Sequence, residues 1–277
     1  MKQTRAILMK RIGLVSLVVA IVASPVHGVR GQIAVLSDAV VERSTAPGES
    51  YQGQLLVKNM TSTTQEARIY QTDFTFAADG RTGYGTPGTA PRSNAKWVAL
   101  GASYVEIPAG ATVPVNYTVS VPADSSLKGS YWSMVMVEAI AEGAPESRAP
   151  NARVQVGLAI ATRYGTQIAT NIGASGVSRL AFDSLTATTT AKGTQGLRFD
   201  FINTGERANR FVLSLELYNE AGELVKKASQ SRGLLYPGTG ARQLFDVGTV
   251  PHGAYTAVLV ADGGGDRVFG GQFKIDY

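Results

Sequence analysis

The sequence predicts an all-β protein made of two immunoglobulin-like β-sandwich domains in tandem. Apolar residues alternate with polar ones along many short segments, as in residues 113–121, and this period of two is typical of strands with one buried face. Turns rich in Pro and Gly separate these segments, and helical spacing with capping residues is nowhere convincing. Short strands joined by tight turns, without crossover helices, favour β-sandwiches.

The predicted strands follow one another along the chain. In residues 113–121, Val and Tyr alternate with Pro, Asn, Thr and Ser. In residues 131–137 apolar side chains occupy both parities, so both faces of that strand are expected to be buried. Further strands are expected at 51–58, 67–71, 154–160, 197–202, 211–218, 242–247, 255–261 and 268–275.

Residues 1–31 are predicted to be a cleaved secretory signal peptide. Four of the 26 basic residues precede an apolar run of twelve residues, 12–23, which is shorter than the roughly 20 residues that span a bilayer. Cleavage is expected after Gly28 or Gly31, and an uncleaved N-terminal anchor is the alternative. Residues 29–277 have 22 basic and 21 acidic residues, so their charge does not point to nucleic acid. We expect a periplasmic or secreted protein.

The composition removes most catalytic chemistry. The chain has no Cys, and of its two His residues only His252 lies outside the signal segment. His252 belongs to a Pro-His-Gly turn, where a solvated imidazole is expected. Nucleophile elbows, HExxH and phosphate-binding loops are missing from the sequence. Hydrolysis by paired carboxylates stays open because such residues need only meet in space. We expect no enzyme activity, no catalytic residues, no metal and no cofactor.

An internal repeat predicts two domains, residues 32–165 and 166–277. In each half, a strand that ends in Asn precedes a Pro-Gly turn, a Val-Pro pair and a Gly-x-Tyr strand start; the Asn residues are Asn59 and Asn203. The spacing from Asn to Tyr is 72 residues in the first half and 52 in the second. Residues 77–96 account for the difference as a long loop or an added hairpin. Tyr131 and Tyr255 are expected to pack inward and to hydrogen-bond to the corner backbone.

The first half resembles the PapD-like periplasmic chaperones of pilus assembly. The matching points are the strand that ends at Asn59, the stretch 97–108, the strand that begins at Tyr131-Trp132 and above all the alternating segment 152–164. The same landmarks also resemble the N-terminal domain of Gram-positive WxL-interacting proteins, which bind peptidoglycan. Both resemblances imply a binding function and an immunoglobulin-like fold.

The chaperone resemblance implies a site. In that family, the last strand of the first domain is exposed at a sheet edge and completes the fold of an unfinished subunit. The client-binding side chains are then Val154, Val156, Leu158 and Ile160. Two basic residues of the family hold the subunit's terminal carboxylate, and by position they fall on Arg163 and Arg43. The family's usual Tyr-Arg-Pro after this strand is replaced by Tyr-Gly-Thr at 164–166, so usher docking does not follow from the resemblance.

The leading functional hypothesis is a chaperone-like protein that binds secreted or pilus-type subunits by β-strand addition, with an outer-membrane usher as a candidate second partner. Covering four aligned apolar side chains could contribute roughly 1.5–3 kcal/mol each. The alternative is a structural or adhesive cell-envelope module that binds peptidoglycan or a surface protein. Residues 154–160 also fit an ordinary inner strand, and Arg163 also fits a solvated side chain.

Overall fold

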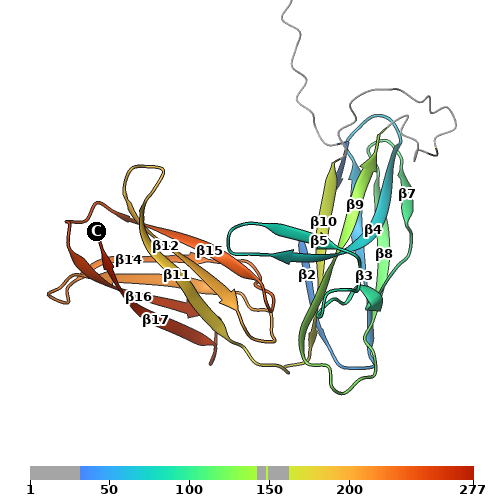
Figure 1. The fold of residues 1–277 in the computed structure, drawn as a ribbon. Coiled ribbons are helices and arrows are strands. Elements are labelled where there is room, and N and C mark those ends of the chain that lie inside the picture. Colours follow the sequence, from blue (N-terminus) through green and yellow to red (C-terminus); the bar gives the residue numbers. More distant parts are fainter. Residues whose placement is uncertain (1–31, 142–147, 149–161) are drawn as a thin grey trace, which may run out of the picture. The chain divides into compact units, whose positions relative to one another are not determined.

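The computed structural model describes residues 32–141, 148 and 162–277, and it confirms the all-β prediction with two β-sandwiches (Figure 1). Helix in these residues is limited to one 3-10 turn, η1 (Ala95–Trp97). Within the same ranges, no helix has the length and apolar character needed to cross a membrane. The predicted strand 154–160 lies outside the described residues.

The first sandwich consists of two sheets. In the first sheet the strand order is β1 (Ile33–Val35), β3 (Ser50–Asn59), β8 (Thr112–Ser120) and β6 (Val98–Leu100). In the second sheet the order is β2 (Val40–Thr45), β10 (Arg163–Ile172), β9 (Gly129–Ile140), β4 (Gln65–Phe76) and β5 (Thr82–Gly85), and β7 (Tyr104–Ile107) pairs with β4. The β2–β10 pairing is parallel.

The core of this sandwich follows the period of two that the sequence displays. On β8, Val115, Tyr117 and Val119 are buried between exposed or half-buried neighbours. On β9, Val135 and Val137 point into the same core. Residues of β9 with the other parity are buried as well, because they form the outer face of the second sheet, which other segments partly cover.

The second sandwich also consists of two sheets. One has the order β11 (Leu180–Thr189), β12 (Gln195–Asn203) and β15 (Gly240–Gly248). The other has the order β14 (Leu224–Ser231), β13 (Val212–Tyr218), β16 (Ala254–Asp262) and β17 (Val268–Asp276). Their inner faces share a core that includes Phe199, Leu213 and Leu259, each 1% exposed or less. The strands expected at 197–202 and 255–261 are confirmed as β12 and β16.

The boundary expected between residues 165 and 166 is wrong. Strand β10 continues through that point to Ile172 and stays hydrogen-bonded to β9 along its whole length. The strand was hard to recognise because two of its inward residues are threonines, Thr166 and Thr170. Thr170 is fully buried, and its hydroxyl bonds to the Tyr51 hydroxyl and to the Asn94 side chain. The connection to the second sandwich therefore begins at residue 173.

Residues 77–96 form the added hairpin, one of the two expected alternatives. Strand β5 pairs with the end of β4, with Tyr84 opposite Phe74. The buried Asp73 carboxylate fixes the chain that follows β5, since it accepts hydrogen bonds from the backbone N–H groups of residues 88, 89 and 90. A single buried acid thus organises a segment with little apolar content.

The two predicted tyrosine corners differ. The Tyr255 hydroxyl donates a 2.7 Å hydrogen bond to the Pro251 carbonyl, as expected. Tyr131 has no such bond; it is half-buried, and its ring packs on Trp97 with centroids 4.6 Å apart. The expectation for Tyr131 was therefore wrong, because η1, which precedes β6, supplies an aromatic neighbour that has no counterpart in the repeat. His252 is exposed in a bend, as expected for a turn.

Candidate functional site

No strand of the described residues pairs with one edge of β10 at its start, and we call residues Arg163–Thr166 the β10 edge. The carbonyl of Thr162 accepts a hydrogen bond from the N–H of Ala139 on β9. In an antiparallel pair every second residue turns its backbone groups toward the partner strand, so the even-numbered residues of β10 hydrogen-bond to β9. The N–H and C=O groups of Arg163 and Gly165 therefore point away from β9. Among the described residues, no strand pairs with them on that side.

The edge is open because the N-terminal segment changes sheets. Strand β1 pairs with β3 in the first sheet, and only after residue 39 does the chain join β10. The first contact is the Gln167 N–H, which donates to the Ala39 carbonyl at 2.9 Å, and β2 then covers residues 167–172. The part of β10 nearer its start receives no cover from β2.

The core side of the β10 edge is firmly held. The Tyr164 hydroxyl donates a 2.7 Å hydrogen bond to the carbonyl of Ile33 on the opposite sheet. Thr166 is 2% exposed, and Ile168 beyond it is fully buried. An ordered edge with unpaired backbone groups is a template for another strand.

Arg163, the expected carboxylate-binding residue, already holds a carboxylate of its own chain. Its Nε lies 3.1 Å from Glu138 Oε1, and Arg68 Nη2 lies 2.9 Å from Glu138 Oε2. Burial raises the pKa of Glu138, but hydrogen bonds from Arg68, Tyr70 and Arg163 outweigh that effect, and the pKa lies below its ordinary value. The Arg163 side chain is 58% exposed.

Arg43, the other expected basic residue, does not lie beside Arg163. In the parallel pairing of β2 with β10, Arg43 is opposite Thr170, seven residues along the strand from Arg163. At about 3.3 Å per residue this is a separation of roughly 23 Å. The structure therefore does not bring the two arginines together. Val154, Val156, Leu158 and Ile160 lie outside the described residues, directly before this strand.

Beside the β10 edge, the outer face of the sheet carries a hollow of about 380 Å³, which we call the outer-face pocket. Its lining comes from β4, β5, β9 and β10: Tyr70, Thr72, Tyr84, Met134, Met136, Arg163 and Gly165. Next to it, the same face is covered by Tyr236, which stacks on Trp132 with ring centroids 4.5 Å apart and is fully buried. Among the described residues, none covers the pocket as Tyr236 covers Trp132.

Sequence reasoning missed this pocket, although two signals were present. Gly165 interrupts a strand, and such a glycine often marks a close approach of other groups. Met134 and Met136 share one parity, which placed them together on one face. The position of Tyr84 in the pocket wall could not be predicted from the sequence, because the pairing of β5 with β4 depends on the turn between these strands.

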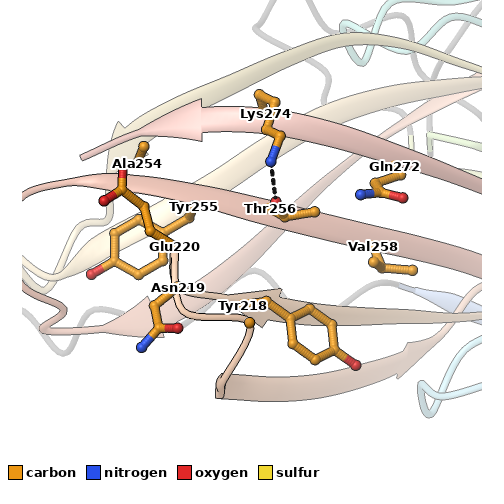
Figure 2. Close-up of a pocket in the computed structure, with 10 residues that line it drawn as sticks. Tyr218, Asn219, Glu220, Ala254, Tyr255, Thr256, Val258, Gln272 and Lys274 are labelled. Atoms are coloured by element: carbon orange, nitrogen blue, oxygen red, sulfur yellow. Dashed lines mark hydrogen bonds between the residues drawn. The ribbon is translucent and has the colours of Figure 1, made fainter.

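A second hollow, of about 790 Å³, lies on the second sandwich (Figure 2). It is lined by β13, β16, β17 and the turn after β13, and its polar groups are largely engaged within the chain. Lys274 Nζ donates to the Thr256 hydroxyl at 2.7 Å, as Figure 2 shows, and Asn219 exchanges hydrogen bonds with Glu223.

In residues 32–141, 148 and 162–277, no group of three or more His, Asp or Glu side chains lies in a position to hold a metal ion. Around Glu138, the charged side chains form a set of ion pairs at the pocket's rim. The arrangement is one that can bind a peptide.

Comparison with known proteins gives similarity at the level of solved structures. No family model and no curated protein matches the chain. The class 5 fimbriae chaperone CfaA is 14% identical, with 87% of this chain and 98% of that chain covered and a TM-score of 0.46. The E. coli chaperone DraB is 11% identical, with 88% and 98% covered and a TM-score of 0.40.

A third match is the CsuC–CsuE chaperone–tip adhesion subunit pre-assembly complex of the archaic chaperone–usher Csu pili of Acinetobacter baumannii. It is 11% identical, with 88% of this chain and 97% of that chain covered and a TM-score of 0.41. The resemblance to pilus chaperones that the sequence suggested is thus found among solved structures as well. At these identities and TM-scores, the likeness says nothing about which partner this chain binds.

Proposed function

We propose that this chain is a non-catalytic, chaperone-like protein that holds an extended segment of another secreted protein, such as a pilus-type subunit, by strand addition at the β10 edge. The observation that supports this most directly is the pair of residues, Arg163 and Gly165, whose backbone groups point to an open side in an otherwise paired strand. The protein works in the periplasm or outside the cell after loss of residues 1–31.

The backbone groups alone would bind weakly. Four hydrogen bonds at a net 0.5–1.5 kcal/mol each, roughly, are partly offset by the entropy lost when the client segment is ordered. Further affinity is proposed to come from the alternating side chains Val154, Val156, Leu158 and Ile160. In the sequence they alternate in phase with Tyr164 and Ile168, the β10 residues that point toward the core. Covered by a client, they would supply the larger contribution.

Arg163 is proposed to bind a carboxylate of the client. Glu138 holds its Nε and so orients the guanidinium, which is exposed at the end of the β10 edge. Arg43 is proposed as a separate contact on β2, because the register keeps it far from Arg163.

A matched pair of variants tests the proposal. The probe is a synthetic peptide of alternating valine and threonine with lysine at its N-terminal end and a free carboxyl terminus. Arg163→Ala removes the side chain only, whereas Arg163→Pro also removes an N–H that β9 does not use. Calorimetry should give weaker binding for Arg163→Ala and a further loss of about tenfold for Arg163→Pro. Equal binding by the two variants, or no binding by the wild type, contradicts strand addition.

The envelope-module alternative predicts a different result. The wild-type protein would then sediment with purified peptidoglycan, and Arg163→Pro would leave this co-sedimentation unchanged. Neighbouring genes for an outer-membrane usher and small secreted subunits would favour the chaperone proposal.

A further inference from the structure

The outer-face pocket adjoins the β10 edge through Gly165. A Cβ placed on Gly165 would overlap the sulfur of Met134 and press on that of Met136. The absence of a side chain at position 165 therefore leaves both thioethers at the floor of the pocket, even though each methionine is less than 10% exposed overall. Any strand that pairs with the β10 edge runs alongside this opening.

The register of an added strand decides which client side chain reaches the pocket. Residues directly opposite each other in paired strands point to the same face, with the strands about 4.8 Å apart. Gly165 faces outward, because its partner on β9 is Met136. The client residue opposite Gly165 therefore points outward too, and no side chain on β10 separates it from the pocket.

The walls of the pocket favour an aromatic occupant. Tyr84 stands at the rim with 61% of its surface exposed, and its ring lies tilted against that of Phe74 at a centroid distance of 5.5 Å. Tyr70 forms part of the lining. Rings pack well on thioether sulfur and on other rings, and a hollow of about 380 Å³ has the size of a small-ligand pocket.

The charge at the rim adds a second feature. Arg163 faces outward two residues before Gly165 and donates its Nε to Glu138, and among the described residues its two terminal nitrogens have no partner. Arg68 is bound to the other oxygen of Glu138. A client residue opposite Arg163 therefore meets an oriented and half-exposed cation, which matches a carboxylate.

We infer that the client segment carries an aromatic residue in the outer-face pocket and an acidic residue two positions away, opposite Arg163. This inference rests on the proposed strand addition and adds a sequence preference to it. The pocket favours particular client side chains, whereas the backbone groups of Arg163 and Gly165 can pair with a client strand of any sequence.

Three amidated peptides of alternating valine and threonine, with lysine ends, test the inference. The first has a central Trp with Asp two positions away, the second has Ala in place of Trp, and the third has Asn in place of Asp. The wild-type protein should bind the first about tenfold more tightly than the second and about threefold more tightly than the third. Fluorescence anisotropy of labelled peptides gives the dissociation constants.

Variants of the protein then test whether the preference for Trp depends on the residues of the outer-face pocket. Tyr84→Ser should reduce the tenfold Trp preference to about threefold or less. Gly165→Ala, which displaces the Met134 sulfur, should reduce the Trp preference to a similar extent. Leu224→Ser is the matched control, because Leu224 is 52% exposed on the second sandwich and lies outside the pocket lining. Its Trp preference should equal that of the wild type.

The outcomes separate the two levels of the proposal. If the peptides bind with equal affinity, or if Tyr84→Ser keeps the full Trp preference, the outer-face pocket does not bind a client side chain. Occupation of the pocket by the chain's own residues 149–161 would give the same result and would likewise contradict the inference. If none of the peptides binds, strand addition itself fails. Melting curves of each variant verify that the loss of preference does not come from unfolding.

Discussion

Asn59 and Asn203 share three corresponding hydrogen bonds in the two sandwiches. Each is fully buried at the end of a strand and donates its side-chain amide to the carbonyl four residues ahead, at 2.7 Å in both cases. Each also donates to the carbonyl three residues before the glycine of a Pro-Gly corner, Ile107 in one sandwich and Leu235 in the other. The internal repeat read in the sequence is thus a repeat of one structural device.

Replacing either asparagine should destabilise its sandwich. Asn203→Leu leaves the N–H of Gly205 without its acceptor and removes one of the two donors to the Arg207 and Leu235 carbonyls, which keep Asn209 as the other. The free energy of unfolding should therefore fall by roughly 1–3 kcal/mol. Denaturant titration measures the change. The exposed Asn116 on β8 provides the control, since Asn116→Leu should alter stability by less than about 0.5 kcal/mol. Similar losses for the two variants would contradict the structural role.

Acid should loosen the β5 hairpin. Burial raises the pKa of Asp73, but hydrogen bonds from Ser93 and from the backbone of residues 90, 88 and 89 outweigh it, so the pKa is lowered. A lowered folded-state pKa means that the stabilisation is present above the unfolded value of about 3.9 and is lost as the pH falls through the folded value.

Asp73→Asn should therefore cost roughly 1–3 kcal/mol at neutral pH, and its difference from the wild type should shrink below about pH 4. Urea titrations across this range measure both effects. A difference that stays constant with pH would show that the carboxylate's charge is irrelevant to the hairpin.

Ile160→Asp tests the client-binding residues expected from the sequence. If Ile160 is exposed in the free protein, its melting temperature should stay unchanged while capture of a secreted client is lost, because a charge is then buried only in the complex. If Ile160 belongs to an inner strand, the variant should lose several kcal/mol of stability. Melting curves beside a pull-down of tagged protein from an envelope extract distinguish the two outcomes.

Export should remove the basic and apolar start of the chain. Mass spectrometry of the protein recovered from the periplasm or the medium should place the N-terminus between residues 29 and 32, as the small residues at 28 and 31 indicate. A mature chain that still begins at Met1 would contradict this prediction.

The alternating patterns and the corner residues are enough to predict the fold class from the sequence. The strand around Val115 and Val119 and the landmarks at Asn59 and Asn203 carry this information locally, in periods of two and in residues that turns require. Strand β10 was partly missed because its inward positions include Thr166 and Thr170, whose hydroxyls are buried and tolerated only through neighbours from distant segments.

The candidate site could be predicted less completely. The alternating residues 154–160 lie directly before β10 in the sequence and stay a prediction. The openness of the β10 edge depends on where the chain leaves the first sheet after β1, which no local pattern specifies. The distance between Arg43 and Arg163 depends on the register of a parallel pair, which no local pattern specifies. The ion pair of Arg163 with Glu138 likewise joins residues of two strands whose pairing had to be seen.

Amide hydrogen exchange at Arg163 and Gly165 tests strand addition most directly. In the free protein their N–H groups should exchange rapidly, whereas the neighbouring N–H groups of Tyr164 and Thr166, which are directed toward β9, should be protected. On addition of the valine–threonine peptide, the Arg163 and Gly165 amides should become protected by at least about tenfold. Rapid exchange of these two amides in the saturated complex would contradict strand addition at the β10 edge.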